Sequence, residues 1–259
     1  MWSAFQQGIF YVIEWFYNLA GDWGLAIILI TLLFRILIYP ITRKQFQSTY
    51  KMQKLQPQIA ELRTKYKDDP QRQQEETMKI YQEAKFNPLS GCLPMILQMP
   101  IFIALYGVLR ALPTFIEQSD LPASALPATL YGIVPDLSQA PSAVFAEGGI
   151  AAAAIYIVLM LLFSVSMLIP ILLNKTKERQ TLIMTGVMSV FMLWIGWSAP
   201  AGVLLYWDIS SLVGVGQQAV SKKLLERKDA NKEAETIEIK PVKVEVERKT
   251  KKSRPKKSK

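Results

Sequence analysis

The chain has 259 residues, 51% of them hydrophobic and 20% charged, and its formal net charge is +9. It contains no histidine and one cysteine, Cys92, which excludes an intrachain disulfide, a cysteine-pair metal site and the histidine-dependent catalytic dyads. The sequence also lacks a GxSxG, an HExxH and a phosphate-cradling loop, so we expect a protein that is not an enzyme and needs no metal or cofactor.

The first 22 residues predict an amphipathic helix that lies in the membrane interface. One face of this helix is apolar and rich in the aromatic side chains that favour that depth. The residues of this face are Trp2, Phe5, Ile9, Val12, Phe16 and Ala20. The alternative is that the segment extends the first membrane span.

Long apolar blocks follow, and they predict an all-α polytopic membrane protein. About 20 helical residues cross a hydrocarbon core that is about 30 Å thick. Pro200 and Gly202 mark a turn that divides the last apolar stretch into two spans. We place five transmembrane helices at about 23–41, 90–110, 150–173, 181–199 and 201–219.

The segment 42–88, between the first two spans, predicts a cytosolic hairpin of two charged helices. Pro57 is expected to kink its first helix. Asp69 and Pro70 suit the cap and the first position of its second helix.

The segment 221–259 is a basic tail without apolar periodicity, which predicts disorder. Its last residues suit ribosomal RNA or anionic lipid headgroups, and the alternative is a solubilising tail with no specific partner. The basic cluster consists of Lys251, Lys252, Arg254, Lys256, Lys257 and Lys259.

The distribution of basic residues predicts the orientation of the spans. Lys and Arg are frequent in the hairpin, between the third and fourth spans and in the tail, whereas residues 1–22 and 111–149 contain none. We therefore expect a membrane protein with its amino terminus outside and its carboxyl terminus in the cytosol.

Arg35 interrupts the first apolar block, roughly 16 Å along the helix from Gly24. A charge near mid-membrane costs about 2.5–3.5 kcal/mol on insertion scales, so such residues usually face a bundle interior or a water-filled cavity. Thr31 lies one turn earlier, and the second and fifth spans carry Gln98 and Asp208. A shared polar interior explains all four residues, and the alternative role of Arg35 is a structural ion pair with Asp208.

Three segments carry a family resemblance: "FRILIYPITRKQFQSTYKMQKLQPQIAELRTKY", "NPLSGCLPMILQMPIFIALYGVLR" and "APAGVLLYWDISSLVGVGQQ". With the five-span order and the basic hairpin, the chain from about residue 20 to 220 resembles the YidC/Oxa/Alb membrane protein insertase family. The resemblance is to the short form, which lacks the large extracytoplasmic domain of longer bacterial members and is similar to proteins of bacteria with a single membrane or to organellar relatives. It implies a multi-pass protein of the bacterial plasma membrane. It implies a hydrophilic groove, enclosed by the five helices, that opens to the cytosol and to lipid and is closed toward the outside.

The resemblance also assigns groove residues. The groove arginine of the family matches Arg35, the polar residue one turn earlier matches Thr31, and the aromatic pair of the last span matches Tyr206 and Trp207. Two departures stand out, because Pro170 and Ile171 replace a polar pair of many relatives and Asp208 replaces an apolar or small polar residue. The predicted groove residues are Arg35, Thr31, Gln98, Tyr206, Trp207 and Asp208.

The implied function is that of a membrane protein insertase and chaperone, which receives the translocated polar segment of a nascent membrane protein, alone or with the Sec translocon. The implied partners are nascent membrane proteins, the ribosome, the Sec translocon and anionic lipids, and we expect a monomer. The alternatives are an assembly scaffold without insertion activity and a small-solute transporter.

Methionine stripes on the second and fourth spans suit a surface that accepts many different client helices. The alternative is ordinary packing against the bundle or lipid. The stripes consist of Met95, Met99, Met184, Met188 and Met192.

Overall fold

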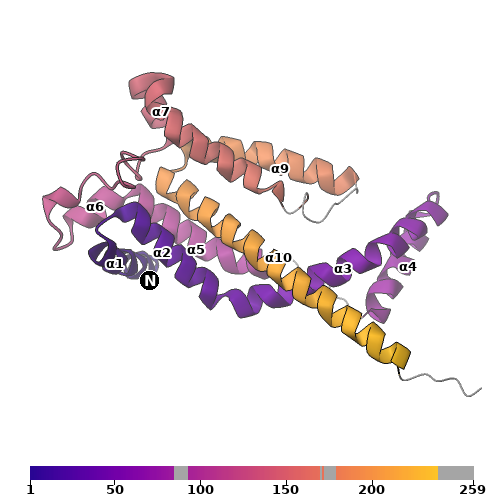
Figure 1. Ribbon diagram of the computed structural model, residues 1–259. Helices are drawn as coiled ribbons and strands as arrows, with labels where there is room; N and C mark the ends of the chain where they lie inside the picture. The colour runs from indigo at the N-terminus through magenta and orange to yellow at the C-terminus, as the bar shows by residue number, and fades with distance from the viewer. Residues whose placement is uncertain (85–92, 170, 172–178, 239–259) are drawn as a thin grey trace, which may run out of the picture. The chain divides into compact units, whose positions relative to one another are not determined.

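The computed structural model describes residues 1–84, 93–169, 171 and 179–238 (Figure 1). Over these residues the chain is helical, and its extended structure is confined to one isolated β-bridge between Leu130 and Val134. The all-α prediction is thus confirmed for the described part of the chain. Clustering of the contacts separates residues 1–222 from residues 223–259, and the packing described below lies within the first unit.

The amino-terminal segment forms a helix of its own, α1 (Trp2–Ala20), and is not a straight extension of the next helix, α2 (Trp23–Leu37). The two helices are bent by 118° at the break between them. Gly21 ends α1 in the left-handed region with φ 71°, which glycine adopts at little cost. Asp22 then caps α2, because its Oδ1 accepts the Leu25 N–H at 2.8 Å.

The hairpin that the sequence predicts consists of α3 (Tyr39–Lys65) and α4 (Pro70–Glu83), which lie side by side. α3 begins a few residues earlier than predicted, with a proline in its first turn where a missing N–H costs no hydrogen bond. Asp69 caps α4 as expected, since its Oδ1 accepts the Arg72 N–H at 3.0 Å. On α4, Lys79 donates to Glu76 Oε1 at 2.6 Å, and this hydrogen bond lowers the pKa of the Glu76 carboxyl and raises that of Lys79.

The remaining helices are α5 (Leu93–Arg110), α6 (Leu112–Glu117), the short 3-10 helix η2 (Ala123–Ala125), α7 (Pro141–Ser166), α9 (Arg179–Ser198) and α10 (Ala201–Glu238). α10 continues into the segment 221–259 that we predicted to be disordered. Its residues beyond Lys222 alternate Lys, Arg and Glu with Ala and Leu, which are good helix formers that also pair charges along a helix. The basic cluster from Lys251 to Lys259 lies outside the described residues.

Among the described helices, α7 is the one that is by itself both long and apolar enough to cross a bilayer. α1 and α2 meet the same test as a bent pair, whereas Gln98–Arg110 and Leu182–Ser198 are apolar but shorter. α10 has its apolar run interrupted by Asp208. The number of five spans therefore stays a prediction.

The hydrophobic core gathers at one end of the bundle, where it combines side chains from α1, α2, α5, α6, α7 and α10. There the segment 118–140 binds the starts of two helices. Gly24 N–H donates to Thr129 O at 3.0 Å, and Gly202 N–H donates to Leu137 O at 2.8 Å. We call this region, formed by residues 22–27, 118–140 and 199–205, the loop end.

α7 and α9 pack along each other (Figure 1). Between them Ser164 Oγ donates to Ser189 O at 2.7 Å, and Ser189 Oγ donates to Ser164 O at 3.4 Å. The outward faces of both helices expose large apolar side chains. These are Val158, Leu161, Leu162 and Val165 on α7, and Leu182, Ile183, Met184, Val187, Val190, Phe191 and Trp194 on α9.

Candidate functional site

Arg35 lies in the last turn of α2 and reaches α10. Its Nε donates to Ser210 Oγ at 2.8 Å. Gly214, one turn further along α10, leaves room for the guanidinium, because a Cβ at that position would lie 3.3 Å from Nη1 and 3.4 Å from Nη2. Two residues of α10 at helical i, i+4 spacing therefore hold the arginine side chain.

A cavity of about 240 Å³ opens beside this arginine. It lies between α2, α3, α5, the end of α7 and α10, and polar side chains provide much of its lining. The lining residues are Arg35, Ile38, Thr42, Gln45, Phe46, Gln98, Ser166, Met167, Ser211, Gly214, Val215 and Gln218. We call it the polar pocket; together with residues 35–46 and 210–218 it forms the pocket end of the bundle.

The structure places Arg35 and Gln98 in the lining of the polar pocket and Tyr206 beside Gln98. Gln98 Nε2 donates to the Tyr206 hydroxyl, which links α5 to α10. Trp207 lies between two rings, with centroid separations of 5.7 Å from Phe102 and 5.3 Å from Phe163, both edge to face. This aromatic pair therefore joins α10 to α5 and α7.

Thr31 is not brought to the pocket. Its side chain is fully buried, and its Oγ1 donates to Ile27 O of the same helix at 2.6 Å. A threonine that bonds back to the carbonyl one turn earlier satisfies its own hydroxyl. The position of Thr31 thus fits helix packing, while its role as a groove residue remains a prediction.

Asp208 is buried, with 8% of its surface exposed. Within the described part of the chain neither carboxylate oxygen has a hydrogen-bond partner. Arg35 bonds Ser210 instead, so the alternative ion pair between Arg35 and Asp208 is not formed in this structure.

The methionines of the predicted client surface divide into two groups. Met99, Met184 and Met188 are exposed by 45%, 66% and 37%. Met192 packs partly buried against the hydrophobic core, so it does not join that exposed face. The Met95 side chain lies outside the described residues.

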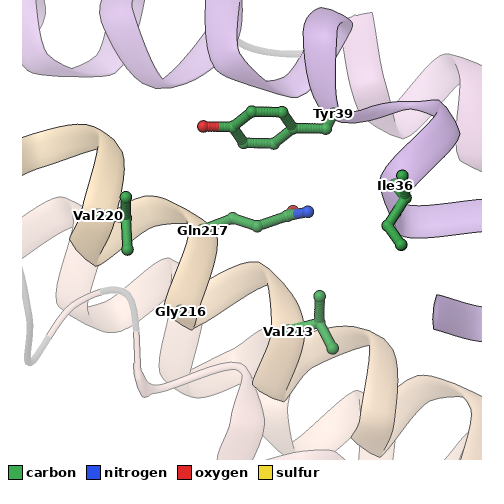
Figure 2. A pocket seen from close by; sticks show the side chains of 6 residues that line it. All are labelled: Ile36, Tyr39, Val213, Gly216, Gln217 and Val220. Atoms are coloured by element: carbon green, nitrogen blue, oxygen red, sulfur yellow. The ribbon is translucent and has the colours of Figure 1, made fainter.

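A second cavity, of about 460 Å³, lies between the α2–α3 junction and α10. Figure 2 shows its six residues, with the Tyr39 ring facing the Gln217 side chain and Val213, Gly216 and Val220 along α10. Gln217 Nε2 donates to the Arg35 carbonyl at 3.3 Å, so this residue connects the apolar cleft to the backbone of the pocket arginine. We call this cavity the apolar cleft.

Ser210, Gly214 and Gln217 contact Arg35 but were not among the predicted groove residues. They recur at intervals of four and three along α10, which places them on one helix face. Grouping the polar residues of this helix by face instead of by depth would have found Ser210 and Gln217, whereas Gly214 has no polar side chain to signal it.

A family model described as "60Kd inner membrane protein" matches residues 15–231, which is most of the chain. The chain belongs to this family. Among relatives of the 60Kd inner membrane protein family, it is 37% identical over 235 residues to the membrane protein insertase YidC of Haemophilus influenzae (strain PittEE), and 36% identical over 232 residues to that of Pasteurella multocida (strain Pm70). Each alignment covers 88% of this chain but 38% of the relative, so the chain spans well under half the length of these relatives.

The fold has a counterpart among solved structures. A crystal structure described as an active YidC insertase with its first transmembrane domain resolved matches with a TM-score of 0.60 and 29% sequence identity. The match covers 83% of this chain and 46% of the other. The resemblance stated from the three sequence segments is therefore confirmed.

Proposed function

We propose that this protein is a membrane protein insertase and chaperone, which receives the translocated polar segment of a nascent membrane protein in the polar pocket beside Arg35. The observation that carries this proposal is the Arg35 guanidinium at a cavity with polar lining residues, in a chain whose helices α7 and α9 expose apolar faces. The insertase names of the YidC relatives support it.

The membrane arrangement is part of the proposal. α2, α5, α7, α9 and the first half of α10 supply the five spans, α1 lies in the interface, and the α3–α4 hairpin stands in the cytosol. The absence of Lys and Arg from residues 1–22 and 111–149 favours placing the loop end outside. The pocket end then faces the cytosol, where a nascent chain arrives.

This arrangement lowers the barrier to insertion in two ways. A hydrated pocket within the bilayer shortens the dry path for a polar tail, which would otherwise cross about 30 Å of hydrocarbon. The fixed positive charge of Arg35 attracts acidic residues of that tail. Burial of the client span, at about 0.8 kcal/mol per CH₂ group, supplies the driving force, so no nucleotide is required.

The loop end supports a dead end on the outer side, and so favours an insertase over a solute transporter. Trp23 Nε1 donates to Ala125 O at 2.9 Å, and the Tyr131 N–H donates to Asp22 Oδ2 at 2.7 Å. Together with the two backbone bonds made by Gly24 and Gly202, these contacts bind the segment 118–140 over the helix starts. A polar pathway through the bilayer would have to pass this packed region.

Further elements of the proposal concern partners. Met99, Met184 and Met188 provide flexible, exposed side chains along the proposed client path on α5 and α9. The basic cluster from Lys251 to Lys259 binds ribosomes or anionic lipid, and sedimentation of translating ribosomes with and without residues 239–259 tests that part separately. The protein acts alone or with the Sec translocon. Insertion by the protein reconstituted without Sec would show that the translocon is not required.

The central experiment uses the full chain in proteoliposomes and single-span clients whose translocated tail is either acidic or neutral. We expect Arg35→Ala to reduce insertion of the acidic client by about tenfold, since one charge–charge attraction of that size is lost. Insertion of the neutral client should change little. Protease protection of the translocated tail measures both.

Arg110→Ala is the matched control, because it removes a guanidinium from an exposed position at the end of α5. It should leave both clients unaffected. Wild-type levels of insertion for every acidic client with the Arg35→Ala protein would overturn the role assigned to the pocket arginine.

A further inference from the structure

Asp208 is the buried charged group that the proposed function leaves without a task. The side chain is more than nine-tenths buried, and both of its carboxylate oxygens are inaccessible to solvent. Neither oxygen has a hydrogen-bond partner among the described residues. A buried carboxylate without a donor is costly, because burial removes hydrogen bonds to water and replaces them with none. The desolvation cost of the Asp208 carboxylate would be offset if a hydrogen-bond donor bound in the space beside it.

The helical register of α10 shows which space that is. Ser211, Val215 and Gln218 line the polar pocket, and Asp208 precedes them by three, seven and ten residues. These intervals return to about the same face of a helix, so Asp208, which does not itself line the pocket, lies on the face of these three residues. It lies about 4.5 Å along the axis from Ser211, one turn nearer the loop end.

Arg35 approaches α10 from a different side. Its contacts are Ser210 and Gly214, which share a face that is rotated away from the stripe of Asp208 and Ser211. Arg35 and Asp208 therefore belong to different faces of α10 and do not neutralise each other. An occupant that reaches one turn beyond the pocket toward the loop end would meet the positive group first and then the carboxylate.

We propose that Asp208 receives a basic side chain of the client segment held in the polar pocket, so that clients with a lysine or arginine near the leading end of that segment form a preferred class. This inference rests on the proposed function and adds a specificity-determining residue to it. Lys and Arg fit the position because a long aliphatic stem can follow the apolar wall while the cationic head reaches the carboxylate. The carboxylate then gains the charge-assisted hydrogen bonds that the chain itself does not supply.

The test uses three single-span clients that share an acidic tail and differ at one position near the leading end of the span, which is leucine, lysine or glutamine. With the wild-type full chain in proteoliposomes, we expect the lysine client to insert nearly as well as the leucine client. Asp208→Asn keeps the size of the side chain and removes its charge. It should lower insertion of the lysine client by about tenfold relative to the leucine client, as expected for one hydrogen bond to a charged group.

Asp120→Asn is the matched control, because it removes a carboxylate from an exposed position of the segment 118–140 and should leave the ratio of lysine to leucine client unchanged. The glutamine client distinguishes recognition of charge from recognition of polarity, and its insertion should not depend on Asp208. Asp208→Glu, which restores the charge, should recover part of the loss.

A second measurement excludes a purely structural role. Because the described chain offers the carboxylate no partner, the melting temperature of the client-free Asp208→Asn protein should equal or exceed that of the wild type. A fall of several degrees, or an unchanged ratio of lysine to leucine client in the Asp208→Asn protein, would overturn this inference while insertion of the leucine client by the wild type keeps the proposed function intact. Failure of the wild type to insert any of the clients would overturn both.

Discussion

The loop end and the pocket end of the bundle use the same helices in opposite ways. At the loop end, α2 and α10 begin among fully buried side chains such as Trp23, Ile27 and Leu204, and their first N–H groups are bound by the segment 118–140. At the pocket end, α2 and α10 touch through Arg35, and the polar pocket and the apolar cleft open beside this contact. The molecule is therefore packed at one end and hollow at the other.

Unpaired polar atoms follow the same division. The buried side-chain atoms without a partner in the described residues belong to Trp207, Asp208, Gln217 and Ser221, all on α10 beyond the loop end. Native proteins satisfy nearly all such atoms, and exceptions mark places where something else binds or moves. The comparison teaches that stability is concentrated in the loop end, so that the pocket end can keep charges and space for an incoming segment.

The largest effect should come from Trp23→Ala, which removes the ring that anchors the loop end. This ring is 2% exposed, stacks on Tyr17 at 4.2 Å between centroids, and donates to Ala125 O. We expect a loss of about 3–5 kcal/mol in the free energy of unfolding, measured by chemical denaturation in detergent micelles. Trp194→Ala, at a position that is 71% exposed, should change it by no more than about 0.5 kcal/mol, and equal losses would contradict the comparison.

A smaller loss should follow from Gly24→Ala. A Cβ at this position would lie 2.4 Å from Leu130 Cδ1 and 2.9 Å from the Leu130 Cα, so the segment 118–140 would have to shift. Overpacking of this kind costs about 1–3 kcal/mol. Gly8→Ala in α1, where no atom lies within 4 Å, is the control and should not destabilise the protein.

Much of the helical fold can be predicted from the sequence, because helix caps and turns depend on local residues. Capping by Asp69, the turn at Pro200 and the separate amino-terminal helix depend on neighbouring residues alone. The sequence predicts that Arg35 and Gln98 share a polar interior, because a charge within an apolar block usually faces other polar groups.

The remaining features depend on contacts between distant segments. Thr31 has the right depth and side of α2, but its hydroxyl bonds within its own helix. The contact between Ser210 and Arg35 joins residues 175 positions apart, and no local pattern specifies which serine of α10 is chosen. Low apolarity predicts disorder beyond residue 220, whereas α10 continues to Glu238 because many of these residues are good helix formers.

Ser164→Ala tests the α7–α9 pair, which stands apart from both ends. The Ser164 Oγ bond to Ser189 O, 2.7 Å long, joins two helices whose outward faces are apolar and exposed. We expect a loss of about 1 kcal/mol in the free energy of unfolding. Ser166→Ala is the control, because its hydroxyl bonds Phe163 O within α7, and a similar loss there would show that the bond between helices is not the cause.

The smallest effect, and one of opposite sign, should come from Gly216→Ala in α10. Gly216 borders the apolar cleft, and a Cβ there would meet no atom within 4 Å (Figure 2). Alanine restricts the unfolded chain and favours the helix, so the free energy of unfolding should rise by about 0.5 kcal/mol. Insertion of acidic clients in proteoliposomes should remain at the wild-type level.

Gly214→Ala makes the same chemical change two residues earlier. It distinguishes the effect of helix propensity from the effect of crowding the Arg35 guanidinium. There the new methyl group would lie 3.3 Å from Arg35 Nη1, so the guanidinium would have to shift by a few tenths of an ångström. This crowding offsets the gain in helix propensity, and insertion of acidic clients should fall several-fold because the charge is displaced from its position beside Ser210. If both alanine variants insert acidic clients equally well, the position of the Arg35 guanidinium against α10 does not affect insertion. The pocket end would then not depend on an exact placement of this charge.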